Sequence, residues 1–163
     1  MDERQQIVHQ EINQQYETTA NDSKLTRALC TLFTNGSDDQ KWLRPSTYFD
    51  DTSNIKIWAC QFEECPTTER LHVQLYVEFS DRIRFGKLRR LFTAQTGDSV
   101  NIRVPKRASN NQRKCGVNYC LKPDSRYDGS DPFIWDGNAI EVAFDPDLYA
   151  KKGTKKSKKQ AEK

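Results

Sequence analysis

Nine consecutive residues, LHVQLYVEF at positions 71–79, alternate strictly between apolar and polar side chains. A period of two is the repeat of a β-strand, in which successive side chains point to opposite faces of a sheet. The segment therefore predicts a strand with one face in a hydrophobic core. The other face of this strand presents His72 and Gln74 side by side, and both can take part in chemistry.

Other segments around this strand predict an α+β domain. Runs rich in β-forming residues and bounded by turn signals indicate strands, and apolar residues at helical spacing indicate helices. We expect strands over 27–35, 55–64 and 99–106, short edge strands within 131–144, and helices within 37–54, over 80–92 from Ser80 or Asp81, and over 109–122. This order favours an antiparallel sheet with helices packed mainly on one face.

Composition divides the 163 residues into one domain with two tails. Residues 1–23 are polar and carry only a weak apolar stripe, so we expect a flexible arm there. The folded domain is predicted over 24–150. The tail 151–163 contains seven lysines and no large apolar residue, which predicts a disordered linker, with a nuclear import signal or a DNA anchor as alternatives. The chain contains no apolar run of about 20 residues and begins with acids and amides, so a soluble protein without a membrane partner is expected.

The five cysteines are predicted to be thiols, because their number is odd and the N-terminus does not resemble a secretion signal. Two pairs, Cys60 with Cys65 and Cys115 with Cys120, leave a zinc site as an alternative. Four residues separate the members of each pair, which is wider than the usual knuckle spacing. Burial as small apolar side chains is the better explanation.

Positive charge is concentrated between residues 82 and 114, where ten lysines or arginines accompany a single acid, Asp98. Segregation of this kind is typical of a surface that binds a polyanion. A solvated helix face is the alternative. The basic residues that we expect to contact DNA are Arg84, Lys87, Arg89, Arg90, Lys106, Arg107, Arg113 and Lys114.

Two acidic residues precede the His72 strand by a short connection, which predicts a hairpin. Glu63 and Glu64 end the 55–64 strand, so one carboxylate can meet the imidazole and the amide of its neighbour. Adjacent strand residues face opposite sides, so strand parity does not choose between the two glutamates. A nitrogen and two oxygens form an incomplete coordination shell that suits Mg²⁺ or Mn²⁺ better than zinc. A half-exposed polar face without a metal is the structural alternative.

Tyr119 and Lys122 are spaced three residues apart in the last predicted helix, so they would lie on one face of it. A packed ring beside a solvated amine explains the pair structurally. The functional interpretation is a tyrosine nucleophile beside a lysine. A phenol has a reference pKa of about 10, so its attack on a phosphodiester needs a nearby cation.

With these motifs the sequence resembles the replication initiators (Rep) of circular single-stranded DNA viruses and rolling-circle plasmids, a branch of the HUH endonucleases. CTLFTN at 30–35 is similar to the family's first motif, LHVQLYVEF to its metal motif, and NYCLK at 118–122 to its tyrosine motif. Gln74 replaces a second histidine, as in the circovirus-like and nanovirus-like branches. The first motif departs from the usual FTLNN, and Pro123 stands where an acid is common. QFEE at 61–64 slightly favours Glu63 as the metal ligand.

The resemblance implies a central five-stranded antiparallel sheet with flanking helices. It implies that Tyr119 nicks and rejoins single-stranded DNA at an origin stem-loop through a 5′-phosphotyrosine link, which starts rolling-circle replication. Lys122 would assist this catalysis, Glu63 or Glu64 with His72 and Gln74 would hold Mg²⁺ or Mn²⁺, and Thr34 and Asn35 would contact DNA. The family further implies action in the host nucleus and oligomerisation through a downstream helicase domain.

A noncatalytic single-stranded nucleic-acid-binding module of RRM-like topology is the alternative function. It would explain the basic residues and the aromatic rings, which can stack on bases. It would not explain why Glu63 or Glu64, His72 and Gln74 are clustered. An ATP-driven helicase is not expected in this chain, because no G-x4-G-K-[ST] loop occurs.

Overall fold

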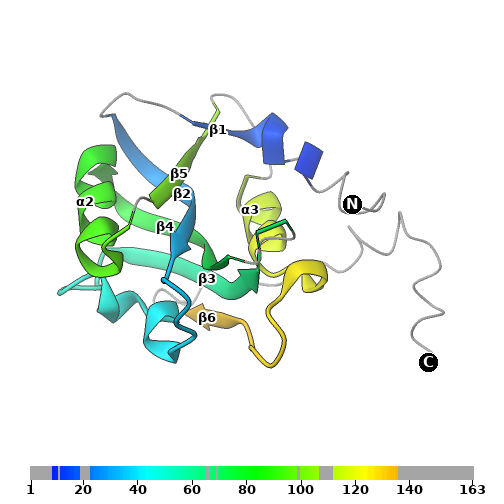
Figure 1. The fold of residues 1–163 in the computed structure, drawn as a ribbon. Coiled ribbons are helices and arrows are strands. Elements are labelled where there is room, and N and C mark those ends of the chain that lie inside the picture. Colours follow the sequence, from blue (N-terminus) through cyan, green and yellow to red (C-terminus); the bar gives the residue numbers. More distant parts are fainter. Residues whose placement is uncertain are drawn as a thin grey trace.

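The computed structural model describes residues 9–10, 12–18, 23–64, 67–68, 70–98, 100–106 and 112–135. Within them six strands form one antiparallel sheet in the order β1-β5-β2-β4-β3-β6 (Figure 1). The strands are β1 (Tyr16–Thr18), β2 (Lys24–Phe33), β3 (Ile55–Glu64), β4 (Leu71–Arg84), β5 (Val100–Pro105) and β6 (Phe133–Trp135). The α+β prediction is confirmed, and β1 extends the sheet beyond the five strands that the resemblance implied.

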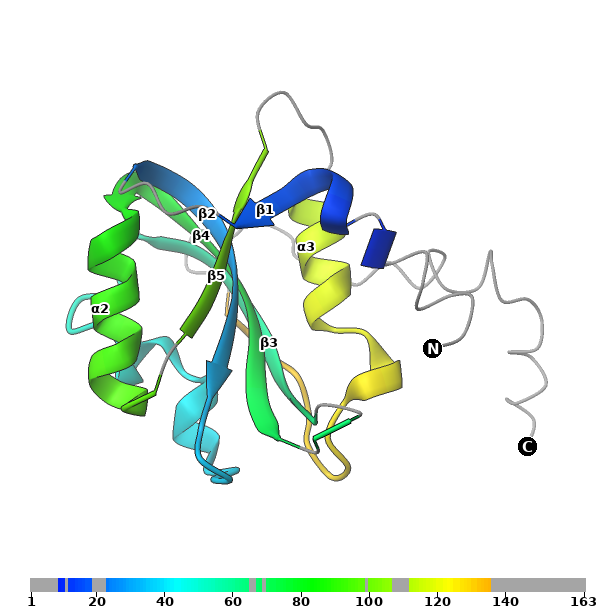
Figure 2. The ribbon, with the colours of Figure 1, turned by 45° about the horizontal axis from the view of Figure 1, so that its top comes forward.

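Helices α2 (Phe85–Thr96) and α3 (Gln112–Cys120) pack on opposite faces of this sheet (Figure 2). Three short 3-10 helices, η1 (Gln40–Leu43), η2 (Pro45–Thr47) and η3 (Pro123–Ser125), lie in the connections. The prediction that the helices share mainly one face is wrong. Because β4 is buried on both sides, each of its faces needs a helical cover.

The alternation in β4 separates two hydrophobic cores. Leu71, Val73, Leu75, Val77 and Phe79 pack with α2 in the larger core. Tyr76, on the other face, packs with Leu29 and with α3 through three buried side chains, Cys115, Val117 and Cys120. The period-two pattern therefore encodes the division of the core. The polar side chains His72 and Gln74 lie on the α3 face.

The predicted helix at 80–92 begins later than expected, at Phe85. Residues 80–84 instead continue β4, where Ile83 and Arg84 pair with Leu25 and Lys24 of β2 across an irregularity in the register. The Ser80 N–H also donates to the carbonyl of Asn54. These long-range backbone hydrogen bonds override the local helix-start signal at Ser80 and Asp81.

The N-terminal segment corrects the expectation of a flexible arm for the part that the structure describes. Ile12 and Tyr16 are 0% and 1% exposed and belong to the core under α3. β1 pairs with β5, and the Tyr16 hydroxyl donates to the Gln112 carbonyl at the start of α3. Two buried side chains and a sheet edge thus hold this segment, although only three apolar residues mark it in the sequence.

Four cysteines, Cys30, Cys60, Cys115 and Cys120, are buried free thiols, while Cys65 lies outside the described residues. Residues 136–163 lie outside them as well, so the expected disordered tail and part of the predicted edge strands stay predictions. No helix in the described part of the chain is long and apolar enough to cross a membrane.

Candidate active site

Three neighbouring strands build the floor of the candidate site in two rows on the α3 face. In the first row His72 of β4 lies between Phe33 of β2 and Glu63 of β3. In the next row Gln74 lies between Thr31 and Gln61. Residues opposite each other in antiparallel strands have neighbouring side chains. The register therefore collects a carboxylate, an imidazole and amide groups on one patch of the sheet.

The register separates the two glutamates. Glu63 is only 3% exposed, and its Oε1 lies 3.5 Å from His72 Nε2. Glu64 is exposed and, as the adjacent residue of β3, points to the other face. The structure thus brings Glu63 to His72 and Gln74 and leaves Glu64 apart from them.

His72 and Gln74 are held in place by their neighbours. His72 Nδ1 lies 3.2 Å from the Arg70 carbonyl, while Nε2 faces Glu63. Gln74 Nε2 donates to the Cys30 carbonyl at 3.1 Å, and Gln74 Oε1 accepts from the Thr31 hydroxyl at 3.2 Å. A carbonyl oxygen has two lone pairs, so Gln74 Oε1 keeps one for a further partner.

Lys122 compensates the buried Glu63 carboxylate. The chain leaves α3 before Lys122, which is extended with φ −64° and ψ 135°, because the following Pro123 disfavours the helical region. Lys122 is 4% exposed, and its Nζ donates to both Glu63 oxygens, at 3.0 and 3.1 Å. Nζ also donates to the Tyr119 carbonyl and lies 3.8 Å from the centroid of the Tyr119 ring. The two residues meet as predicted, although Lys122 stands beyond the end of the helix.

Burial and charge set the ionisation of this pair. Burial acts to raise the pKa of Glu63, but the Lys122 ammonium and hydrogen bonds from His72 and Gln61 outweigh it, so the pKa falls below 4.5. Burial likewise acts to lower the pKa of Lys122, but Glu63 raises it above 10.5. At neutral pH the site therefore contains a carboxylate and an ammonium.

Tyr119 is half-buried between two cationic or polar groups. The ring of His9 packs edge-on against the Tyr119 ring, with the two centroids 5.2 Å apart, and the Lys122 ammonium lies over the Tyr119 ring. Burial raises the pKa of Tyr119 above 10.0, against the opposing effect of Lys122. The phenol is therefore protonated at neutral pH, and its proton must be removed when it acts as a nucleophile.

Gln61 and Arg126 connect the floor to the segment after α3. Gln61 Nε2 donates to Glu63 Oε2 at 2.9 Å and to the Lys122 carbonyl at 2.7 Å. Arg126 Nε donates in turn to Gln61 Oε1 at 2.8 Å, and its Nη2 donates to the Leu121 carbonyl. The sequence analysis missed both residues. Gln61 was detectable, because it stands two positions before Glu63 and so shares its face.

A second cluster anchors the start of α3 to the same face of the sheet. Glu78 is 2% exposed and accepts from the Tyr76 hydroxyl at 2.6 Å and from Arg113 Nε and Nη2 at 3.0 and 2.7 Å. Arg27 and Lys56 also lie within 3.4 and 3.7 Å of its carboxylate. This paired carboxylate fixes the first turn of the helix that carries Tyr119.

An open groove of about 640 Å³ runs beside Tyr119. Its floor includes Thr31, Phe33 and Gln74, and one wall comes from the N-terminal segment. On the β5 side, the cationic side chains of Arg103 and Lys106 line the groove together with Asn101. Polar groups, cations and aromatic rings together suit a nucleic-acid strand. Of this lining, the sequence analysis assigned roles to Gln74, Lys106 and Tyr119, and it included Thr31 and Phe33 in the first motif and Arg103 in the basic stretch.

The predicted DNA-binding residues do not form one surface. Arg84, Lys87, Arg89 and Arg90 belong to α2 or its cap, on the face opposite Tyr119 (Figure 2). The Arg113 guanidinium is paired with Glu78, whereas Lys114 is exposed on α3 and Arg107 lies outside the described residues. Thr34 is buried and donates to the Ser37 carbonyl, and Asn35 has φ 55° and donates to the Thr96 carbonyl. The last two residues therefore shape a turn, and the first-motif residues that line the groove are Thr31 and Phe33.

Comparison with known proteins gives relatives of one kind. The chain is 38% identical over 133 residues to a replication-associated protein of Chaetoceros protobacilladnavirus 2, which covers 80% of the chain and 27% of that protein. It is 33% identical to that of Chaetoceros diatodnavirus 1, over 83% of the chain and 30% of the relative. It is 34% identical to that of an Avon-Heathcote Estuary associated kieseladnavirus, over 76% and 26%. No protein-family model matches the sequence.

The chain thus spans between 26% and 30% of the length of these relatives. The matched region comprises about four fifths of the chain. In sequence, this chain is similar to part of the replication-associated proteins of viruses.

Proposed function

We propose that this chain is an HUH-type replication initiator endonuclease that nicks and rejoins single-stranded DNA through Tyr119. The observation that carries the proposal is the contact of the Tyr119 ring with Lys122, whose ammonium holds the Glu63 carboxylate beside His72. Tyr119 and Gln74 line one groove, and Lys122, Glu63 and His72 lie next to them on the same face of the sheet. The similarity to viral replication-associated proteins supports the same conclusion.

In the proposed reaction the Tyr119 oxygen attacks the phosphorus of a phosphodiester in line. The bond from phosphorus to the 3′ oxygen breaks, the phenol loses its proton, and the leaving oxygen gains one. The products are a 5′-phosphotyrosine and a free 3′-hydroxyl. A later 3′-hydroxyl can attack the phosphotyrosine and reverse the step, so ends are rejoined without ATP.

Lys122 has two roles in this proposal. Its ammonium opposes the rise in the Tyr119 pKa that burial causes, which favours the phenolate during attack. It also keeps Glu63 ionised at neutral pH despite burial. His9 packs edge-on against the Tyr119 ring and so limits how far the phenol can rotate.

The donor set fits Mg²⁺ or Mn²⁺. Glu63, His72 and Gln74 offer a carboxylate, an imidazole nitrogen and an amide oxygen on one face, and the first two approach to 3.5 Å. These three residues would hold the ion, which would polarise the scissile phosphate as a Lewis acid. Lys122 donates to both Glu63 oxygens, so its ammonium would have to withdraw from at least one of them when the ion binds.

The nucleophile is tested by a stem-loop DNA library incubated with Mn²⁺ and either the wild-type chain or Tyr119→Phe. We expect Tyr119→Phe to form no covalent adduct and to bind DNA within a few-fold of the wild type. Tyr127→Phe is the matched control, because the Tyr127 hydroxyl makes no hydrogen bond within the described part of the chain. An adduct that mass spectrometry locates on another residue would contradict the assignment. Absence of any adduct in the wild type would favour the noncatalytic alternative.

The metal ligands are tested by comparing Glu63→Gln with Glu64→Gln. We expect Glu63→Gln to abolish the rise in melting temperature that Mn²⁺ causes and to abolish nicking, while Glu64→Gln retains both. EDTA should stop the wild-type reaction, and Mg²⁺ or Mn²⁺ should restore it. Equal effects of the two substitutions, or full activity in EDTA, would refute this ligand set.

As the resemblance implies, the DNA in the cell is an origin stem-loop in the host nucleus, and oligomerisation comes from a helicase region of a longer protein.

A further inference from the structure

We infer that the outer face of α2 is a second nucleic-acid site, which binds the backbone of a DNA duplex while the groove at Tyr119 holds a single strand. The inference rests on the proposed function, since it names a second part of the same substrate. It concerns different residues on a different face of the molecule.

The position of α2 separates this surface from the reacting strand. α2 and α3 cover opposite faces of the sheet, and the sheet lies between them (Figure 2). Packed layers lie about 10 Å apart, so the two helices are separated by about 20 Å. A phosphate bound at α2 is therefore not the phosphate beside Tyr119.

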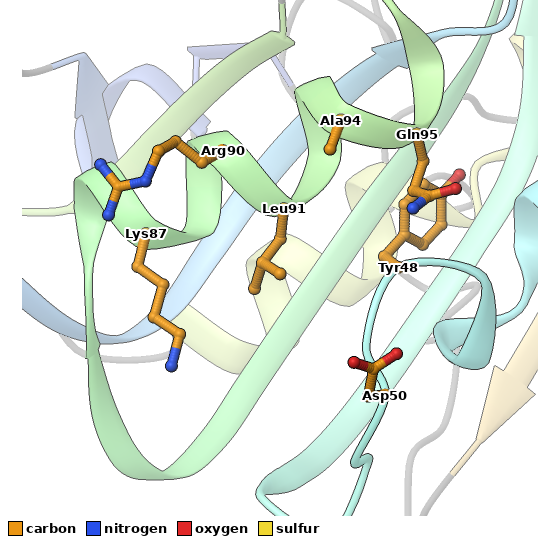
Figure 3. A pocket seen from close by; sticks show the side chains of 7 residues that line it. All are labelled: Tyr48, Asp50, Lys87, Arg90, Leu91, Ala94 and Gln95. Carbon is orange, nitrogen blue, oxygen red and sulfur yellow. The ribbon is translucent and has the colours of Figure 1, made fainter.

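A groove of about 420 Å³ follows the outer side of α2. Lys87, Arg90 and Leu91 line it from neighbouring turns of the helix, and Tyr48 and Asp50 come from the chain after η2; the Arg90 guanidinium is directed away from Tyr48 and Asp50 (Figure 3). Residues three apart on a helix are neighbours, about 5 to 6 Å apart at their Cβ atoms. The two cations therefore form a short track along the groove.

These cations have no acidic partner among the residues that the structure describes. Arg84, Lys87 and Arg90 are exposed and form no ion pair within the residues that the structure describes. α2 itself contains no acidic residue in its first turn, and Asp50 is the acid that faces the groove. Unpaired cations with one opposing carboxylate are complementary to a polyanion.

The two grooves differ in a way that distinguishes a duplex from a single strand. The groove at Tyr119 has the rings of Phe33 and Tyr119 in its lining, and bases of a single strand can stack on such rings. In the α2 groove the aromatic ring is that of Tyr48, which is only 4% exposed. Cations without a stacking surface suit the backbone of a duplex, whose bases are already stacked.

The spacing of the two sites fits one substrate that has both forms. A duplex rises about 3.4 Å per base pair, and the DNA must pass around an edge of the sheet, so a stem longer than about six base pairs is needed to reach from one face to the other. A strand cleaved next to such a stem can engage both faces. Contacts with the stem would fix the position of the strand without reading the bases.

The test compares two fluorescent probes, a 20-base-pair duplex of mixed sequence and the single strand dT20, in binding titrations over a range of salt concentrations. The variants are Lys87→Glu with Arg90→Glu on α2, and Lys106→Glu in the groove at Tyr119. We expect the α2 double variant to lower the ratio of duplex affinity to dT20 affinity at least tenfold. Its salt slope with duplex should flatten by about two, one for each lost phosphate contact.

The matched variant Lys106→Glu should change the ratio in the opposite direction, because Lys106 lines the other groove. Circular dichroism and the melting temperature establish that each variant is folded. Equal losses for both probes in the α2 variant would overturn the inference and indicate a general effect of charge. Unchanged affinities would overturn it as well and make α2 a solvated helix face. Loss of nicking in Tyr119→Phe has no bearing on these titrations, so the two proposals fail separately.

Discussion

Gly116 gives the sharpest test of how α3 is seated on the sheet. The residue lies in the middle of α3, where helix propensity by itself favours alanine over glycine by about 1 kcal/mol. The tertiary structure predicts the opposite. A Cβ at this position would stand 2.5 Å from Tyr76 Cδ1, 2.8 Å from Tyr76 Cε1 and 2.9 Å from Tyr16 Oη. We therefore expect Gly116→Ala to destabilise the protein.

The magnitude follows from these contacts. Carbon atoms pack at about 3.5 to 4.0 Å, so α3 or the Tyr76 ring must move by about 1 Å. Neither ring moves freely, because Tyr76 donates to Glu78 and Tyr16 donates to the Gln112 carbonyl. Overpacking in a rigid core costs about 1 to 3 kcal/mol, and the gain in propensity offsets about 1 kcal/mol of it. The difference is about 0 to 2 kcal/mol. Because all three contacts are shorter than 3.0 Å and neither tyrosine can yield freely, we expect the upper half of this range, a net loss of about 1 to 2 kcal/mol.

Urea unfolding followed by tryptophan fluorescence measures this loss, and Trp58 reports from the core. Ala94→Gly on the exposed side of α2 is the control, since it measures the propensity difference where no packing intervenes. It should cost about 0.5 to 1 kcal/mol. Tyr119 follows Gly116 on the same helix, so Gly116→Ala should also slow adduct formation more than it weakens DNA binding. A variant as stable as the wild type, or more stable, would refute the close approach of α3 to Tyr76.

Two further predictions concern the buried carboxylates. Glu78→Gln should lower the free energy of unfolding by about 1 to 2 kcal/mol in urea titrations. This is less than the loss of a fully buried ion pair would cost, because the Arg113 side chain is 38% exposed and can be hydrated. An unchanged midpoint would contradict the role of Glu78 as an anchor. Lys122→Met should cost about 3 kcal/mol at pH 7 in EDTA, since it leaves Glu63 buried without its ammonium. In the wild type, the lowered pKa of Glu63 contributes stability above pH 4.5 that is lost as the pH falls below that value. In the variant, burial raises the pKa of Glu63, so protonation of Glu63 relieves the destabilisation as the pH falls. The difference between the two proteins should therefore shrink from pH 7 to pH 4, and a difference independent of pH would refute the coupling.

Some features of the site could be predicted because they are local. A period of two in LHVQLYVEF places His72 and Gln74 on one face whatever the rest of the fold does. The strands at 55–64 and 99–106 were predictable for the same reason, since their side chains carry the propensity themselves. The spacing of Tyr119 and Lys122 also brought them together, although Pro123 moved Lys122 off the helix.

Other features depended on contacts between distant segments. The choice of Glu63 over Glu64 required the register of β3 against β4, because a shift of one residue exchanges the two faces. The burial of Ile12 and Tyr16 required a partner, the core under α3, that lies about a hundred residues later in the chain.

What the sequence by itself determined is which side chains share a face of a strand or a helix, because backbone geometry sets that periodicity within a few residues. Only the tertiary structure decided which face each helix covers. The basic residues of α2 and the first turn of α3 belong to one stretch of positive charge in the sequence, 82–114, yet the two helices lie on opposite sides of the sheet. The physical reason is that β4 is apolar toward α2 and polar toward the site, so burial of α2 against the apolar face directs its cations away from Tyr119.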